Sequence, residues 1–214
     1  IGIGRYGRLP ESVSLRYPAT DVIAMRALLV ERFGFRPDRV VALTDEEATR
    51  AAIERAIASI PATGRALIYF SGHGFHDQKR DLTYLLPFDA EMQDASTTCI
   101  ALRDLRDKFD DLSANKVVTI LDACHSGGIK IQGTKGVEES PYQYYLDAFE
   151  QAEGRPMLLS SDQSEVSWEM ANGQNSVFTH FLIKGMSGDA DFDGDGVVGF
   201  SEASRYVEQR VPEY

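Results

Sequence analysis

The chain of 214 residues has the length of a single domain, and its hydrophobic content of 43% is enough for a sizeable core. Its 22 Lys and Arg against 33 Asp and Glu leave a net charge of −11. That balance argues against non-specific binding to nucleic acid or anionic lipid, and it agrees with a site for basic peptides or divalent cations. No apolar run approaches the length of about 18 residues that a membrane span requires. Two cysteines are too few for a disulfide scaffold, which favours a reducing compartment and a cytoplasmic protein.

Short apolar runs alternate with amphipathic segments along the chain. Apolar residues at helical spacing predict helices over 21–35, 46–60, 102–112, 176–186 and 201–211. Thr44 and Glu47 have the spacing of a capping box, which predicts the start of the second of these helices. Runs of strand length predict strands over 39–43, 65–70, 116–121 and 156–161. The alternation predicts an α/β fold in which a mostly parallel sheet carries helices on both faces.

Two of the predicted strands end in unusual polar clusters. The run RALIYF is followed by SGHG, which contains His73, and KVVTIL is followed by DACHSGG, which contains Cys124. Functional residues gather at the carboxyl ends of strands in open α/β sheets. The separation of about 50 residues, with His first, is one known for paired catalytic His and Cys. We therefore expect a base and a nucleophile here, with backbone N–H groups around Gly74 and Gly127 facing a developing oxyanion.

Each of these residues also has a simpler explanation. A single cysteine at a strand end often packs in the core, and a histidine among glycines often lies in a turn or at the surface. A zinc site formed by His73, Cys124 and His125 is a further alternative, although no C-x₂-C or H-x₃₋₅-H spacing supports it. The placement of both clusters at the ends of neighbouring predicted strands favours catalysis.

The two clusters together resemble the caspase-like cysteine peptidases. YFSGHG (69–74) and DACHSGG (122–128) are most similar to the metacaspase branch, including its bacterial members, the orthocaspases. Further similarity lies in LRYPATD, ALTDEEATR and SVFTHFLIKGMSGDAD, so it extends over nearly the whole chain. The resemblance implies a three-layer sandwich around a six-stranded, mostly parallel sheet. It also implies a His73–Cys124 dyad that hydrolyses peptide bonds through an acyl-enzyme.

The same resemblance implies how the chain is organised. A single domain over 1–214 is expected, with a part like a large subunit over about 1–128, a loop over about 129–155 and a part like a small subunit over about 156–214. The loop segment is polar and contains Lys130, Lys135 and Arg155, each of which suits self-cleavage by an Arg/Lys-specific enzyme. An ordinary mobile surface loop is the alternative.

Three residues are candidates for the pocket that receives P1, the substrate residue before the cleaved bond. Asp122 precedes Cys124 by two positions, so on an extended strand both side chains point to the same face. A carboxylate there suits a guanidinium, which it can bind through two parallel hydrogen bonds. Metacaspases cleave after Arg or Lys, and the resemblance places Asp122, Asp21 and Ser71 at pocket positions. For Asp21 alone, stabilisation of a helix N-terminus is the alternative.

The segment DFDGDGVVGFSE (191–202) fits the D-x-D-x-D-G-x₅-E pattern of EF-hand calcium loops. Its expected ligands are Asp191, Asp193, Asp195 and Glu202. A turn that merely joins the last two helices is the alternative. Ca²⁺ is not required for the expected chemistry.

The leading hypothesis is therefore a cysteine endopeptidase acting on proteins or peptides with Arg or Lys at P1. A regulatory sensor domain, a subunit or another trigger is expected to control it, and no nucleic acid or membrane is expected as a partner. The alternative is a catalytically silent caspase-like scaffold or calcium-responsive interaction domain.

Overall fold

The structure is a computed structural model that describes residues 1–61, 65–111, 116–125, 156–160 and 173–214. For residues 109–111, 116, 124 and 125 it describes the backbone alone. The predicted loop over 129–155, with its three basic residues, lies outside these ranges, as does Gly127. None of the described helices is both long and apolar enough to cross a bilayer.

Most of the described elements overlap predicted segments, but the helix and the two strands between residues 82 and 101 were not predicted. The helices are α1 (Pro18–Glu31), α2 (Arg50–Ala58), α3 (Ala95–Thr98), α4 (Leu102–Asp111), α6 (Val177–Lys184) and α7 (Phe200–Arg210). The strands are β1 (Arg65–Asp77), β2 (Leu82–Leu85), β3 (Ile100–Ala101), β4 (Lys116–His125) and β5 (Met157–Leu159).

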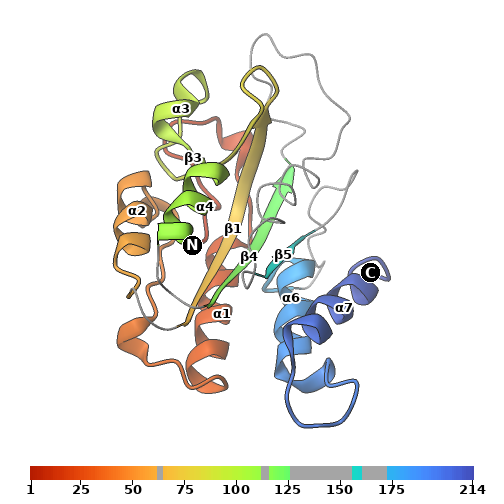
Figure 1. Ribbon diagram of the computed structural model, residues 1–214. Helices are drawn as coiled ribbons and strands as arrows, with labels where there is room; N and C mark the ends of the chain where they lie inside the picture. Colours follow the sequence, from red (N-terminus) through yellow and green to blue (C-terminus); the bar gives the residue numbers. More distant parts are fainter. Residues whose placement is uncertain (62–64, 112–115, 126–155, 161–172) are drawn as a thin grey trace.

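The strands form one sheet in the order β3-β2-β1-β4-β5 (Figure 1). Strand β4 pairs in parallel with both β1 and β5, whereas β2 pairs antiparallel with β1 and β3. The described residues thus form a five-stranded mixed sheet in place of the predicted six-stranded, mostly parallel one. The physical reason is that β1 runs on past its apolar section to Asp77, and a short hairpin then returns the chain beside it, which forces antiparallel pairing.

The run RVVAL (39–43) was wrongly predicted to be a strand. It follows a 3₁₀ turn over Pro37–Arg39, and the chain beside it pairs only through an isolated bridge between Gly2 and Thr44. Val41 is 58% exposed, and Ala42 and Leu43 are only partly buried against the core. The capping box of Thr44 and Glu47 forms, but it opens a single 3₁₀ turn, and Thr49 caps α2 instead.

Helices cover both faces of the sheet, as predicted (Figure 1). Side chains of neighbouring strand residues point to opposite faces, so Phe70 and Leu121 pack with α2 and α4, while Tyr69 and Ile120 pack with α1, α6 and α7. The three layers therefore arise directly from the alternation along β1 and β4.

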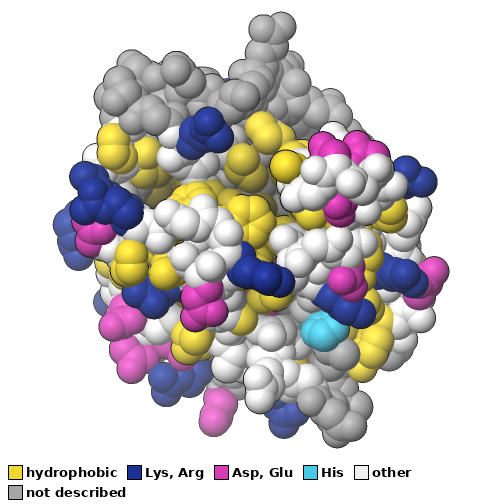
Figure 2. Space-filling view, turned by 90° about the horizontal axis from the view of Figure 1, so that it is seen from below, with side chains coloured by type: hydrophobic (Ala, Val, Ile, Leu, Met, Phe, Trp, Pro, Cys, Tyr) yellow, Lys and Arg dark blue, Asp and Glu magenta, His cyan; other side chains and the backbone are white. Residues whose placement is uncertain are grey.

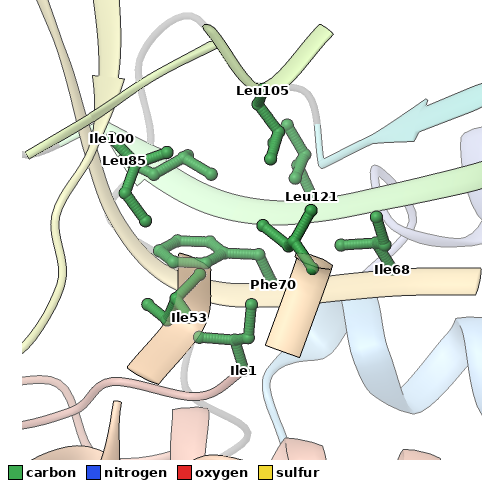
Figure 3. A pocket seen from close by; sticks show the side chains of 9 residues that line it. Ile1, Ile53, Ile68, Phe70, Leu85, Ile100, Leu105 and Leu121 are labelled. Carbon is green, nitrogen blue, oxygen red and sulfur yellow. The ribbon is translucent and has the colours of Figure 1, made fainter. Parts of the chain in front are cut away.

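A small cavity between the sheet and helices α2 and α4 is lined entirely by apolar side chains, with Ile53, Phe70, Leu105 and Leu121 pointing into it (Figure 3). Apolar cavities of this kind stay dry and belong to the core. The face in Figure 2 mixes basic and acidic side chains and gathers no single sign of charge.

Removal of a side chain at the centre of this sheet should be costly. Leu121 is 1% exposed beside the apolar cavity, so Leu121→Ala should lower the free energy of unfolding by about 2–5 kcal/mol, because the existing void grows. The control Val41→Ala should change it by less than about 0.5 kcal/mol, since that side chain is exposed. Urea unfolding of both variants measures this. A cost at Val41 equal to that at Leu121 would mean that 39–43 is packed as a strand after all.

Candidate active site

The parallel ladder between β1 and β4 brings the two polar clusters of the sequence side by side. In its register, His73 pairs with Cys124, Gly74 with His125, and Ser71 with Asp122. Neighbouring strands lie about 4.8 Å apart, so residues at one register level are direct neighbours. The backbone thus places the expected base and nucleophile next to each other. The zinc alternative is untested, because it requires the side chains of Cys124 and His125.

The imidazole of His73 is buried and held by the segment that precedes α1. Its Nε2 lies 2.6 Å from the carbonyl oxygen of Val13. A carbonyl only accepts, so Nε2 carries a proton, and in the neutral ring Nδ1 is the basic nitrogen. This tautomer is the one that leaves Nδ1 able to take a proton from a thiol.

Tyr6 makes two further contacts with the same residue. Its hydroxyl accepts a hydrogen bond from the backbone N–H of His73 at 2.7 Å, and its ring stacks on the imidazole with centroids 5.3 Å apart. A Cβ added at Gly72 would lie 3.1 Å from the Tyr6 hydroxyl, so the glycine before His73 makes room for this contact. Neither Tyr6 nor Val13 was predicted from the sequence, because no motif marks them.

The three candidate pocket residues come together from three elements. Asp21 in α1 is fully buried and Asp122 in β4 is 3% exposed. The Ser71 hydroxyl in β1 donates to Asp21 Oδ2 at 3.2 Å. Asp21 lies in the first turn of α1, as stabilisation of the helix N-terminus requires. The hydrogen bonds to its carboxylate come instead from Ser71, Asn175 and Ser176, in other elements.

The residues at the start of α6 bind both carboxylates and were missed by sequence reasoning. Asp21 Oδ1 accepts from Asn175 Nδ2 and from the backbone N–H of Ser176, both at 3.0 Å. The Ser176 hydroxyl donates to Asp122 Oδ2 at 2.5 Å, and its oxygen also accepts from the N–H of Thr179 as the N-cap of α6. The N-terminal end of a helix carries partial positive charge, which favours two acids here. The only sequence signal was the N-cap serine itself.

Burial raises the pKa of both pocket carboxyls. For Asp21 the desolvation of the buried group is the main cause, the charge of Asp122 adds to it, and the pKa rises to about 6. The pKa of Asp122 is raised by burial, against hydrogen bonds from Ser176, Thr179 and Ser160 that favour its charged form. Within the described ranges, no Lys or Arg lowers the pKa of either carboxyl. The two carboxyls therefore have no cationic partner among the described residues.

The acidic loop before α7 gathers three of its four expected ligands. Carboxylate oxygens of Asp191, Asp193 and Asp195 lie within 4.8 Å of one another. Gly196 has φ 82°, the left-handed conformation that a sharp turn requires. Glu202 instead accepts from the backbone N–H groups of Phe192 and Gly199. The loop thus has a shape compatible with a cation, with Glu202 engaged at the start of α7.

A mixed α/β sandwich with His73 and Cys124 at one register level of neighbouring strands is the arrangement expected of a caspase-family cysteine peptidase domain. The family described as "Caspase domain" matches residues 1–213, and the chain belongs to it. The chain is similar to metacaspases of Arabidopsis thaliana: metacaspase-9 (28% identical over 143 residues, 57% of this chain and 44% of that protein) and metacaspase-4 (31% over 154 residues, 65% and 35%). It therefore spans less than half the length of these relatives, and its sequence identity to them is low. A bacterial origin stays a prediction.

The raised pKa of Asp21 predicts how stability depends on pH. The folded pKa is about 6 and the ordinary value is about 3.9, so between these values the folded state binds the proton more tightly. The stability from this group is therefore complete at low pH and is lost as pH rises through about 6. Asp21→Asn keeps an oxygen for Asn175 and Ser176 but no charge. It should raise the free energy of unfolding at pH 7 by on the order of 2–3 kcal/mol and flatten the dependence between pH 4 and pH 7.

Urea unfolding from pH 4 to pH 7 measures this, with Asp38→Asn at an exposed ion pair with Arg36 as the control. A variant that is less stable than the wild type at pH 7, with unchanged pH dependence, would contradict the prediction.

Proposed function

We propose that this domain is a cysteine endopeptidase that cleaves peptide bonds after Arg or Lys. The observation that carries the proposal is the register of β1 and β4, in which the His73–Cys124 pair lies two positions beyond the Ser71–Asp122 pair. The base and the nucleophile are thereby next to a buried pair of carboxyls. Membership in the caspase family supports the reaction class, because the family consists of peptidases of this kind.

The proposed reaction starts with transfer of the thiol proton of Cys124 to Nδ1 of His73. The thiolate attacks the carbonyl carbon of the scissile bond, and the oxyanion that forms accepts hydrogen bonds from backbone N–H groups, for which those of Cys124, Gly74 and Gly127 are the candidates. The imidazolium then protonates the leaving amine as the C–N bond breaks. A water molecule, deprotonated by His73, hydrolyses the thioester and releases the second product.

The acidic pocket supports a cationic P1 residue. Two carboxyls that are buried beside each other repel when both are charged, and an entering guanidinium or ammonium group relieves that repulsion. Asp21 and Asp122 each retain hydrogen-bond acceptor capacity beyond the bonds to serine, threonine and asparagine donors. An aspartate at P1 would instead add a third acid, so we expect its rejection.

Fluorogenic peptides that end in Arg, Lys or Asp test the proposal directly. The wild type should hydrolyse the Arg and Lys peptides and not the Asp peptide. Cys124→Ala and His73→Ala should each lower the rate by about 10³-fold or more, because they act as one unit. Asp122→Asn should lower kcat/KM for the Arg peptide by about 10²-fold, since one charge of a buried pair is lost. Asp38→Asn is the surface control and should leave the rates unchanged.

Two outcomes would contradict the proposal. Faster cleavage of the Asp peptide would overturn the assignment of the pocket. Failure of Cys124 to react with an Arg-based electrophile, with or without calcium, would favour the silent scaffold. Self-cleavage at Lys130, Lys135 or Arg155, and control by a sensor domain or subunit, stay predictions. The first is checked by whether the Cys124→Ala chain remains uncut.

Calcium binding by the loop over 191–202 also stays a prediction, and it can be measured without activity. Calorimetric titration of the chain with Ca²⁺ should show one site, and Asp193→Asn should weaken binding at least about tenfold because a ligand charge is lost. Glu208→Gln in α7 serves as a charge-matched control. No binding at millimolar Ca²⁺ would mean that the loop is only a turn. Hydrolysis in a chelator then decides separately whether catalysis needs the ion.

A further inference from the structure

A chain of buried hydroxyl groups leads to the carboxylate of Asp122. The Thr179 hydroxyl in α6 donates to Asp122 Oδ2 at 3.0 Å, and the Tyr69 hydroxyl in β1 lies 2.5 Å from the same Thr179 oxygen. A hydroxyl has one proton, so Thr179 can donate to the carboxylate only if it accepts from Tyr69. The proton order is therefore Tyr69 to Thr179 to Asp122.

The chain lies where apolar side chains would fit as well. Thr179 is fully buried, and Tyr69 is 6% exposed within an apolar cluster that includes Met25, Ile120 and Leu182. Valine and phenylalanine have nearly the same shapes and would bring no polar group into this layer. The chain has threonine and tyrosine at these positions, and not valine and phenylalanine, so we look for a role of the two hydroxyls. The atom to which they lead is Asp122 Oδ2.

The surroundings of Asp122 otherwise oppose its charge. Among the described residues, the titratable groups that face it are Asp21 from α1 and Tyr69 from β1, and the remaining polar neighbours are the hydroxyls of Ser160, Ser176 and Thr179. Within this part of the chain, hydrogen-bond donors alone favour the carboxylate before a substrate arrives. Two of them, Ser176 and Thr179, meet at the same oxygen. Such charge-assisted bonds are about twice as strong as bonds between neutral groups, and chains of them reinforce one another.

We propose that Thr179 and Tyr69 are positioning residues of the pocket, whose hydroxyl chain holds the Asp122 carboxylate in one orientation and in its charged form for an incoming cation. This role rests on the proposed function, in which Asp122 receives P1. Thr179 acts on Asp122 directly, and Tyr69 acts through Thr179. Neither hydroxyl touches the reacting atoms, so their loss should weaken binding of a cationic side chain far more than it slows the chemical step.

Matched variants separate this role from simple packing. Thr179→Val and Tyr69→Phe remove the two hydroxyls and keep the shapes, while Thr179→Ser restores the first. The controls are Thr83→Val and Tyr84→Phe in β2, where Thr83 bonds His76 and Tyr84 stacks on Phe75, outside the pocket. Thr179→Val should raise KM for the Arg peptide by about tenfold with kcat changed by less than about twofold. The acid limb of its kcat/KM profile should move to higher pH, because the charged form of Asp122 loses a donor.

Tyr69→Phe should show the same pattern to a smaller degree, and Thr179→Ser should restore both values. The controls should keep wild-type KM and pH profile. A Thr179→Val enzyme with wild-type KM and an unmoved acid limb would overturn the proposal. So would an equal loss in Thr179→Ser, since the hydroxyl would then not be the cause.

Binding of agmatine, which presents a guanidinium on an alkyl chain, tests the pocket without catalysis. Calorimetry between pH 5.5 and pH 8 should give about tenfold weaker binding for Thr179→Val than for the wild type. If the wild type binds agmatine about tenfold more tightly than Thr179→Val but hydrolyses no peptide, the proposed function fails and the role of the hydroxyls stands. If it cleaves after Arg while the variants bind agmatine as the wild type does, the role of the hydroxyls fails alone. A wild type that does not bind agmatine also overturns the inference.

Discussion

The parallel pairing of β1 with β4 is the interaction on which the rest of the site depends. Side chains alternate between the two faces of a strand. A register shift of one residue would therefore pair His73 with a residue whose side chain points to the opposite face. The register is enforced from both sides, because Phe70 and Leu121 fill one apolar layer while Tyr69 and Ile120 fill the other. Core packing thereby determines which residues of the two polar clusters become neighbours.

The polar groups of the site lie in the interior, next to apolar side chains of the core. Two carboxyls are buried there, and their raised pKa values show that the fold holds them against their preference for water. Hydrogen bonds from the start of α6 offset part of that cost. Under the proposed function, the arrangement gives up some stability in exchange for recognition of a charge, which is a common relation between binding sites and the folds that contain them.

Much of this architecture could be predicted from periodicity and motifs. The apolar sections of β1 and β4, the helices α4, α6 and α7, and the adjacency of His73 with Cys124 follow from local patterns that agree with the global fold. The extension of β1 could not be predicted, since its second half is mostly polar and is held by pairing with β4 up to Gly74 and with β2 from Gly74 onward. The strand expected over 39–43 failed because β-branched residues favour a sheet only where a partner strand exists.

The missed pocket residues have another cause. Asn175, Ser176 and Thr179 look like an ordinary helix start, and their partners lie more than 50 residues away in sequence. Nothing in the local pattern states which distant acid a capping serine will meet. The hydrogen bonds of Tyr6 and Val13 with His73 could not be predicted for the same reason.

The two hydrogen bonds that Ser176 donates have a consequence for the order in which the parts of the site form during folding. Its N–H binds an acid from the first helix and its hydroxyl binds an acid from the central strand, so the pocket is complete only when the late helix α6 has docked. A chain in which α6 has not docked could already pair β1 with β4 and set His73 beside Cys124. It would lack the donors from α6 that hold both acids. Under the proposed function, selection of a basic side chain therefore requires that α6 has docked, and an incompletely folded chain would not select the bond to cut.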